Sequence, residues 1–216
     1  EVLKGCIAEK GSARIVLSTG ASQFDTIKAL VKEPGIKWDC VEMFHLDEYV
    51  DLPITHVASF RKYLQERFVD KVGALKAVHF VDGTREGIAK LTEEIRKEPI
   101  DIGLIGIGEN GHIAFNEPAE EFSKGTNCVK LTQMTIDANA RFFESKDDVP
   151  KEAYTMGIGS IMKAKKILIV ACGEDKAEIV KKAFTGPITP QVPASVLQLH
   201  PDVTLVGDAA AMKYMI

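Results

Sequence analysis

One histidine stands in a glycine-rich turn that directly follows an apolar run of the sequence. His112 comes after the run 100–107, and Asn110 and Glu117 flank it. The glycines that let the backbone bend tightly here are Gly106, Gly108 and Gly111. A histidine oriented by a carboxylate or an amide is the usual arrangement for proton transfer near neutral pH. No second histidine lies at ligand spacing, so the segment predicts acid–base chemistry and no metal site.

Two adjacent carboxylates, Asp47 and Glu48, follow the apolar run 41–46. A desolvated carboxylate at the end of a strand acquires a pKa suited to removing a proton, so the pair could supply a general base. Neighbouring side chains of an extended chain point in opposite directions, so only one of the two can face a cleft. The alternative is a solvated acidic loop.

An anion site is indicated after the run 14–18. Residues 18–23 (STGASQ) offer hydroxyl groups, a glycine and the start of a helix, where backbone N–H groups favour a phosphate. Ser22 and Asp25 have the spacing of a capping box. A plain turn with an N-cap explains the segment equally well.

Two cations could meet such an anion. Lys176 follows the run 166–172 and opens a helix, where the helix dipole disfavours a cation unless an anion lies nearby. Arg141 lies in the short helical stretch 135–143, and its planar guanidinium suits a phosphate. Each of the two could also be an ordinary surface residue.

These segments need strands to position them, and the apolar runs alternate with amphipathic stretches. The strands that we expect are 14–18, 41–46, 77–81, 100–107, 166–172 and 203–207. The expected helices are 24–31, 57–72, 88–95, 175–184 and 209–214, and the stretch 194–199, to which no element is assigned, follows a loop with Pro and Gly. This alternation predicts an α/β fold, a single doubly wound, mostly parallel sheet flanked by helices, with residues 1–216 as one domain. Ligands of such sheets bind at the carboxyl ends of the strands, where all these segments fall.

Composition excludes several classes of protein. The 216 residues include 27 Lys and Arg and 31 Asp and Glu, a net charge of −4, so no nucleic-acid partner is expected. No apolar run approaches the roughly 20 residues of a membrane span, and residues 1–11 lack the pattern of a signal peptide. The cysteines are scattered, which favours reduced thiols and a cytoplasmic location: Cys6, Cys40, Cys128 and Cys172. A phosphate site with acid–base groups, and no metal or dinucleotide motif, indicates isomerase or lyase chemistry on a sugar phosphate.

The segments together resemble the glucosamine-6-phosphate deaminase (isomerase) family. The matching motifs are STGAS, LDEYVDLP, GIGENGHIAFNEP, ANARFF, YTMGIGSIM and VPASVLQLH, in the family's order over nearly the whole chain. The related 6-phosphogluconolactonases share the fold and the glycine-rich turn but differ around DEY and FNEP. A lactonase-type hydrolase is therefore the alternative, as is a pseudoenzyme that only binds a sugar phosphate.

The resemblance implies conversion of glucosamine 6-phosphate and water into fructose 6-phosphate and ammonium, without a cofactor. It implies that Asp47 moves the C2 proton toward C1 through an enolamine, and that His112, supported by Glu117, assists ring opening. It also implies a phosphate site, made by Thr19, Gly20, Ala21, Ser22, Arg141 and Lys176. The motifs leave open whether glucosamine or galactosamine 6-phosphate is preferred.

The chain departs from the family's pattern in places that matter. Asn110 stands where many members carry an Asp that helps to orient the histidine, and Gln23 replaces a common Pro. Some members are activated by N-acetylglucosamine 6-phosphate, which binds between subunits to basic residues after FNEP. Here Asn127 and Val129 take those basic positions, and Glu120 and Glu121 stand where serines would be. We therefore expect hyperbolic kinetics, and a monomer or homodimer rather than a hexamer.

Overall fold

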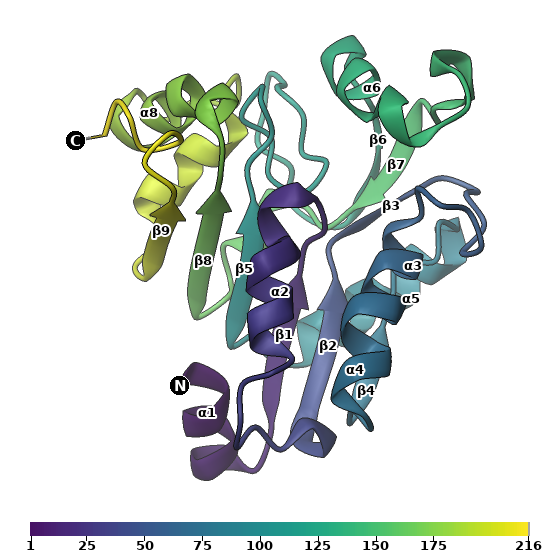
Figure 1. The fold of residues 1–216 in the computed structure, drawn as a ribbon, viewed down its shortest axis with the longest axis vertical. Helices are drawn as coiled ribbons and strands as arrows, with labels where there is room; N and C mark the ends of the chain where they lie inside the picture. Colours follow the sequence, from purple (N-terminus) through teal and green to yellow (C-terminus); the bar gives the residue numbers. More distant parts are fainter. Residues whose placement is uncertain (216) are drawn as a thin grey trace.

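A six-stranded parallel sheet forms the centre of the protein, in a computed structural model that describes residues 1–215 (Figure 1). Its strand order is β4-β2-β1-β5-β8-β9, and every neighbouring pair is parallel. The strands are β1 (Ala13–Leu17), β2 (Val41–His45), β4 (Ala77–His79), β5 (Ile102–Gly106), β8 (Lys166–Ala171) and β9 (Val203–Gly207). This confirms the predicted mostly parallel sheet.

Helices cover both faces of this sheet because its central strands are apolar on both sides. All five residues of β1 are buried. Ile15 and Leu17 pack on one face, with α1 (Val2–Lys10), α2 (Phe24–Leu30), α3 (Phe60–Leu64) and α4 (Asp70–Val72) on that side. Val16 points to the other face, which α5 (Arg85–Lys97), α7 (Ile158–Ile161) and α8 (Ala177–Thr185) cover. The fold is therefore doubly wound, as predicted.

The strand order changes direction between β1 and β5. The chain runs outward from β1 to β2 and β4, then returns to the centre and runs outward from β5 to β8 and β9. At the carboxyl ends of the two central strands, the backbone N–H of Ser18 donates a hydrogen bond to the carbonyl of Leu104 at 3.0 Å. The loops after β1 and β5 must therefore diverge from one point, which is where sheets of this kind bind ligands.

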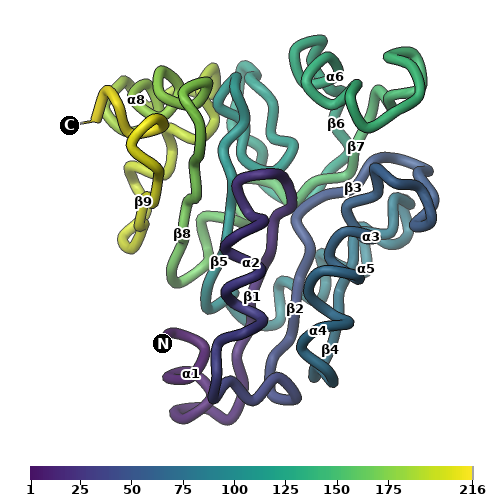
Figure 2. The backbone as a smooth tube through the Cα atoms, viewed as in Figure 1, coloured from purple at the N-terminus to yellow at the C-terminus, as the bar shows by residue number. Residues whose placement is uncertain are grey.

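A second, smaller sheet stands above this point, and the sequence analysis did not predict it. It has the order β3-β7-β6 with antiparallel pairs, and its strands are β3 (Asp47–Tyr49), β6 (Asn127–Lys130) and β7 (Glu152–Thr155). The chain leaves the large sheet at the end of β2 and enters the small one as β3 (Figure 2). The small sheet carries α6 (Gln133–Asn139).

Two expected helices differ from the structure, and one unassigned stretch takes a definite form. The stretch 57–72 begins only at Phe60, because the Ser59 side chain caps α3, and it contains the π-helical turn Gln65–Val69 before α4. The stretch 194–199 is a 3-10 helix, Pro193–Leu199. Residues 209–214 form turns rather than a helix. The Asp208 side chain caps this segment by accepting a hydrogen bond from Ala211 N–H at 2.8 Å. One backbone hydrogen bond of α-helical spacing follows, from Met212 N–H to the Asp208 carbonyl, and the next ones, from Lys213 and Met215, have the shorter spacing of turns.

The remaining short elements are the helix α1, which was not expected, and several 3-10 turns: Ala21–Gln23, Trp38–Cys40, Ala140–Phe142, Lys146–Asp148 and Glu174–Lys176. Within residues 1–215, none of the helices has the length and apolar character needed to cross a membrane.

Candidate active site

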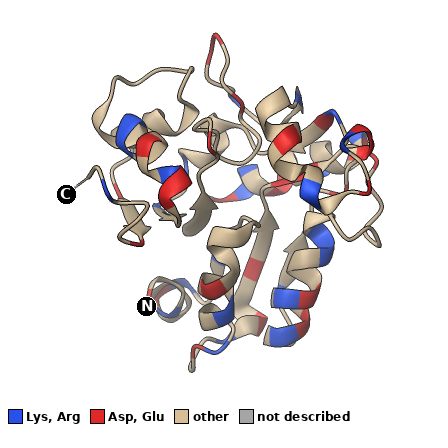
Figure 3. Cartoon of the chain, turned by 45° about the horizontal axis from the view of Figure 1, so that its top comes forward, with Lys and Arg blue, Asp and Glu red and all other residues tan. Residues whose placement is uncertain are grey.

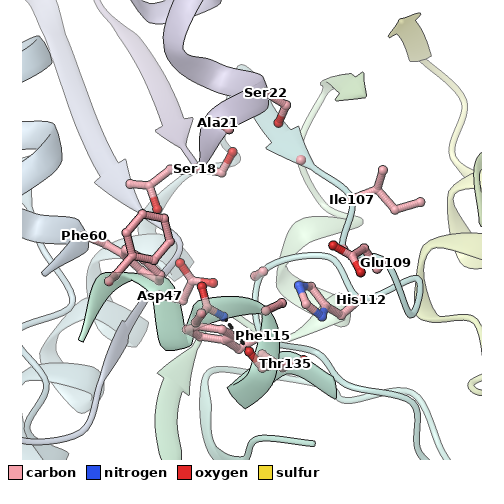
Figure 4. Close-up of a pocket in the computed structure, with 18 of the residues that line it drawn as sticks. Ser18, Ala21, Ser22, Asp47, Phe60, Ile107, Glu109, His112, Phe115 and Thr135 are labelled. Carbon is pink, nitrogen blue, oxygen red and sulfur yellow. Dashed lines mark hydrogen bonds between the residues drawn. The ribbon is translucent and has the colours of Figure 1, made fainter. Parts of the chain in front are cut away.

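A cavity of about 430 Å³ lies at the switch point of the large sheet (Figure 4). Its walls come from the loops after β1, β5 and β8, from β3 and from the region of α6. It brings together nine of the ten predicted site residues: Thr19, Gly20, Ala21, Ser22, Asp47, Asn110, His112, Arg141 and Lys176. Glu117 does not line it and lies behind His112, facing a second hollow.

The loop after β1 turns at Gly20, whose φ of 109° and ψ of 166° only glycine adopts readily. The 3-10 turn Ala21–Gln23 and then α2 follow directly. The predicted capping box does not form, because Ser22 lies inside the turn and makes no cap hydrogen bond. Ser22 lines the cavity instead, and it lies so close to Gly106 that a Cβ there would stand 3.3 Å from its Oγ.

The loop after β8 repeats this geometry. Gly173 has a φ of 96° and a ψ of 152°, and a 3-10 turn leads from it into α8. Lys176 is the third residue after this glycine and lines the cavity with its side chain 18% exposed. Its Nζ lies 3.7 Å from a carboxylate oxygen of Asp175, so the cation is only weakly neutralised within the described chain.

Arg141 approaches the cavity from the small sheet's side. It lies in the 3-10 turn Ala140–Phe142 after α6, and its guanidinium stacks on the ring of Phe142 at 4.9 Å from the centroid. Lys176 and the turn at Gly20 line the same cavity, so positive charge and the start of the 3-10 turn Ala21–Gln23 are available where a phosphate was predicted.

Strand β3 directs its two carboxylates to opposite sides, as the alternation of an extended chain requires. Asp47 lines the cavity and is 6% exposed. Glu48 is fully buried on the other side, where it accepts hydrogen bonds from Ser59 Oγ at 2.7 Å and from Arg61 N at 3.0 Å and Nε at 3.2 Å. The prediction that only one carboxylate faces the cleft is confirmed, and the alternative of a solvated acidic loop is wrong.

The environment of Asp47 favours its neutral form. Burial raises the pKa of this carboxyl to about 8, and the nearby negative charge of Glu48 adds to the rise. His45, at the end of β2, supplies no compensating cation, because burial and the charge of Arg61 lower its pKa to about 3. A carboxylate that titrates near neutral pH inside a cavity has the properties of a general base.

The turn after β5 packs the His112 side chain against the backbone of Gly108 in the same turn. Gly108 N–H donates to the His112 carbonyl at 2.9 Å, and Gly111 turns the chain with a φ of 86°. A Cβ on Gly108 would lie 2.3 Å from His112 Nε2, so only glycine leaves room for the imidazole. Asn110 fixes the loop from the other side, since its Oδ1 accepts a hydrogen bond from His112 N–H at 3.1 Å.

Glu117 and Asn110 form the support behind the imidazole. Glu117 Oε2 lies 3.6 Å from His112 Nδ1 and accepts a hydrogen bond from Asn110 Nδ2 at 2.5 Å. Thr132 also donates to this carboxylate from its hydroxyl at 3.2 Å. Burial opposes the charge of Glu117, but His112, Thr135 and Asn110 outweigh it and lower the pKa of Glu117 to about 2. The carboxylate therefore stays ionised and faces the imidazole.

Sequence reasoning missed the residues that shape the rest of the cavity. Ser18 and Thr135 add buried hydroxyl groups, and Phe60, Tyr63 and Phe115 add aromatic surface. Ser18 lies in the segment 18–23 that the sequence analysis assigned to an anion site, but it was not named there as a site residue. The aromatic residues carry no local signal that separates them from core positions. The described residues contain no group of His, Cys, Asp and Glu able to hold a metal ion.

Comparison with known proteins agrees with this geometry. Residues 1–206 match the family model described as glucosamine-6-phosphate isomerases/6-phosphogluconolactonase. The chain belongs to this family. The predicted resemblance is confirmed, and the fold class with it.

Curated relatives share close to half of their residues with the chain. A protein of Lactobacillus helveticus named glucosamine-6-phosphate deaminase is 47% identical over 217 residues, which cover 99% of this chain and 90% of the relative. A protein of the same name from Lacticaseibacillus paracasei is 45% identical over 207 residues, covering 94% and 87%.

Among solved structures, a deaminase is more similar to the chain than a lactonase is. A monomeric glucosamine-6-phosphate deaminase superimposes with a TM-score of 0.89 at 34% identity, covering 97% of this chain and 91% of that one. A 6-phosphogluconolactonase from Shewanella baltica has a TM-score of 0.77 at 18% identity, covering 95% and 88%, and shares the fold alone.

Proposed function

We propose that this protein is a glucosamine-6-phosphate deaminase, which converts glucosamine 6-phosphate and water into fructose 6-phosphate and ammonium. The observation that carries the proposal is the placement of a buried carboxylate, Asp47, in one cavity with His112 and the two cations Arg141 and Lys176. The names of the curated relatives at 45% and 47% identity support it.

Asp47 is proposed as the base that carries the C2 proton to C1. In its ionised form the carboxylate removes the proton from C2 of the open-chain sugar, the electron pair forms the C1=C2 double bond of the enolamine, and the C1 carbonyl oxygen takes up a proton. Delivery of the C2 proton to C1 leaves an iminium group at C2, which water hydrolyses to the ketone with release of ammonium. Because the pKa of Asp47 is raised to about 8 in the free protein, kcat/KM should increase with pH up to that region.

His112 is proposed to assist opening of the pyranose ring by moving a proton between the ring oxygen and the C1 hydroxyl. Glu117 faces its Nδ1 at 3.6 Å and stabilises the imidazole when it carries a proton. Asn110 is proposed to position both groups, because it bonds to the backbone of His112 and to the carboxylate of Glu117. No cofactor is needed for these steps.

The phosphate is proposed to bind at the start of the 3-10 turn after β1. Thr19, Gly20, Ala21 and Ser22 line that end of the cavity, and Arg141 and Lys176 supply the cations. A dianion there would meet backbone N–H groups and two positive charges, which fits a substrate with a phosphate at C6.

A coupled assay tests the proposal. Purified protein is given glucosamine 6-phosphate, galactosamine 6-phosphate and 6-phosphogluconolactone in parallel, and fructose 6-phosphate, ammonium and the lactone's hydrolysis are measured. We expect fructose 6-phosphate and ammonium in equal amounts from the first. Hydrolysis of the lactone alone would establish the alternative lactonase, and binding without turnover would establish a pseudoenzyme.

We also propose that the protein works in the cytoplasm as a monomer or homodimer. All four cysteines are free thiols, which suits a reducing compartment. The structural relative at 34% identity is described as monomeric, which supports the smaller assembly.

A further inference from the structure

Ser18 places a buried hydroxyl group on the wall of the cavity. The residue is only 7% exposed, and its Oγ makes no hydrogen bond to any group of the described chain. Buried hydroxyl groups almost always have a partner, because leaving one unpaired destabilises the folded protein. An unpaired hydroxyl that lines a ligand cavity is therefore a group that a ligand completes.

The position of this hydroxyl is fixed by the sheet. Ser18 directly follows β1, and its N–H donates to the Leu104 carbonyl of the neighbouring strand at 3.0 Å. In Figure 4 it stands between Ala21, in the proposed phosphate loop, and Asp47, the proposed base. Phe60 and Phe115, which line the same region, have no polar side-chain atoms and could not satisfy this hydroxyl.

We propose that Ser18 is a substrate-binding residue, whose hydroxyl exchanges a hydrogen bond with a hydroxyl group on the middle carbons, C3 to C5, of the open sugar chain. This rests on the proposed function. With the phosphate on C6 held by the loop after Gly20 and with C2 at Asp47, the carbons between them must pass Ser18. Each carries a hydroxyl that can both donate and accept, which matches the serine hydroxyl.

The test uses a ligand that binds without reacting. The affinity of 2-amino-2-deoxyglucitol 6-phosphate, an open-chain analogue with no carbonyl, is measured by calorimetry for the natural chain and for Ser18→Ala. Three further analogues each lack the hydroxyl at C3, C4 or C5. We expect Ser18→Ala to bind the parent compound roughly threefold to tenfold more weakly, the loss of one neutral hydrogen bond. For the analogue that lacks the partner hydroxyl, the two proteins should bind equally.

Ser22→Ala is the matched control, because it removes the same hydroxyl from a position proposed to hold the phosphate. Its affinity should fall by one common factor for the parent and all three deoxy analogues. Thermal unfolding gives a second readout. Since Ser18 Oγ has no protein partner, Ser18→Ala should melt at the same temperature as the natural chain or higher.

Several results would overturn the inference. One is that Ser18→Ala and the natural chain bind the parent compound with equal affinity. Another is that Ser18→Ala loses affinity by the same factor for the parent and all three deoxy analogues. The third is that the natural chain does not bind the parent compound. A lower melting temperature with unchanged affinity would assign the hydroxyl to a structural water. Absence of fructose 6-phosphate in the coupled assay would overturn the proposed function alone, because the calorimetric comparison decides the role of Ser18 without turnover.

Discussion

The proposed base and its neighbour show how one strand gives two carboxylates different properties. Asp47 faces the cavity with its pKa raised by burial, whereas Glu48 has donors around it and an arginine beside it. Folding therefore keeps Asp47 in an environment that disfavours its charge. Such a residue is expected to be needed for activity and costly for stability.

Replacing Asp47 by asparagine should abolish turnover and stabilise the protein at high pH. Only the carboxylate can take the C2 proton, so kcat should fall by at least ~10²-fold while KM changes only a few-fold. In the folded protein the pKa of Asp47 is about 8, above its ordinary value of 3.8. The ionisation of Asp47 therefore lowers the free energy of unfolding of the natural protein progressively as pH rises between those values. Asp47→Asn should therefore gain most in melting temperature at pH 8 and least near pH 4. Substantial isomerisation by the purified variant would refute the role.

The amide of Asn110 contributes to the charge state of Glu117. Against the effect of burial, the pKa of Glu117 is lowered to about 2 mainly by His112, and Asn110 adds to this by donating a hydrogen bond to Oε2 at 2.5 Å. In Asn110→Asp a second carboxylate would occupy this place, and two such groups cannot both be ionised without repulsion. One of them would titrate above its ordinary pKa, so stability should fall as pH rises from about 5 to 8.

Thermal unfolding at pH 5 and pH 8 measures this effect. Asn110→Ala is the control, because it removes the hydrogen bond without adding charge and should lower the melting temperature by a similar amount at both pH values. An Asn110→Asp variant as stable at pH 8 as at pH 5 would contradict the proposed contact between the amide and Glu117.

At the scale of the elements, the turn after β5 has the sharpest steric requirement. A Cβ on Gly108 would lie within 2.3–2.5 Å of three atoms of the His112 ring, so Gly108→Ala must push the imidazole away. We expect at least a tenfold loss in kcat/KM with the fold retained, since a displaced acid–base group loses its geometry. Gly5→Ala, in α1 with open space around it, is the control and should keep full activity. Unchanged kinetics in Gly108→Ala would show that His112 has no fixed position in the reaction.

Two separate elements, the 3-10 turns Ala140–Phe142 and Glu174–Lys176, supply the cations of the proposed phosphate site. Arg141→Ala and Lys176→Ala should each raise KM by roughly 10- to 100-fold, as expected for a charge-assisted hydrogen bond of about 1.5–3 kcal/mol. Lys90→Ala, which removes an exposed lysine of α5, should leave KM unchanged. The comparison of glucosamine with its 6-phosphate completes the test, because equal rates for both would remove the case for a phosphate site.

The elements that position the site differ in how well the sequence predicts them. Strands such as β1 and β8 are nearly continuous apolar runs, and the residues that follow them could be assigned to one edge of the sheet. The small sheet could not be predicted, because β3 has three residues and pairs with β7, about 100 positions further along the chain. Asp47 lies in this pairing, so the sequence alone left a desolvated carboxylate and a solvated acidic loop as two open alternatives.

Over the whole molecule, basic and acidic residues are interspersed along the helices (Figure 3). Lys90–Glu86 and Lys182–Glu178 are ion pairs one helical turn apart. This distribution agrees with the net charge of −4 and with the expectation of a small ligand rather than a nucleic acid. The positive charge that matters for the proposed function is local to the cavity.

The last prediction concerns the second hollow, of about 310 Å³, which lies behind Glu117. It is the place where the resemblance would put an effector phosphate, and it is lined by Glu121, Asn127, Val129 and Lys130. Lys124 does not line it, so two carboxylates, Glu117 and Glu121, face one lysine. Net negative charge repels a phosphate. We therefore expect no effector to bind between subunits, and no hexamer.

We therefore expect hyperbolic rate curves in glucosamine 6-phosphate, with no change on adding N-acetylglucosamine 6-phosphate. Sedimentation should give the mass of one or two chains, independent of either sugar. Val129→Lys combined with Glu121→Ser serves as the informative variant, because it reverses the charge of the hollow without touching the cavity at the switch point. If this variant binds N-acetylglucosamine 6-phosphate at the hollow and the natural chain does not, the charge of the hollow explains why the natural chain is not activated. A sigmoidal curve of the natural chain that becomes hyperbolic with the acetylated sugar would show that the loop after FNEP has been misread.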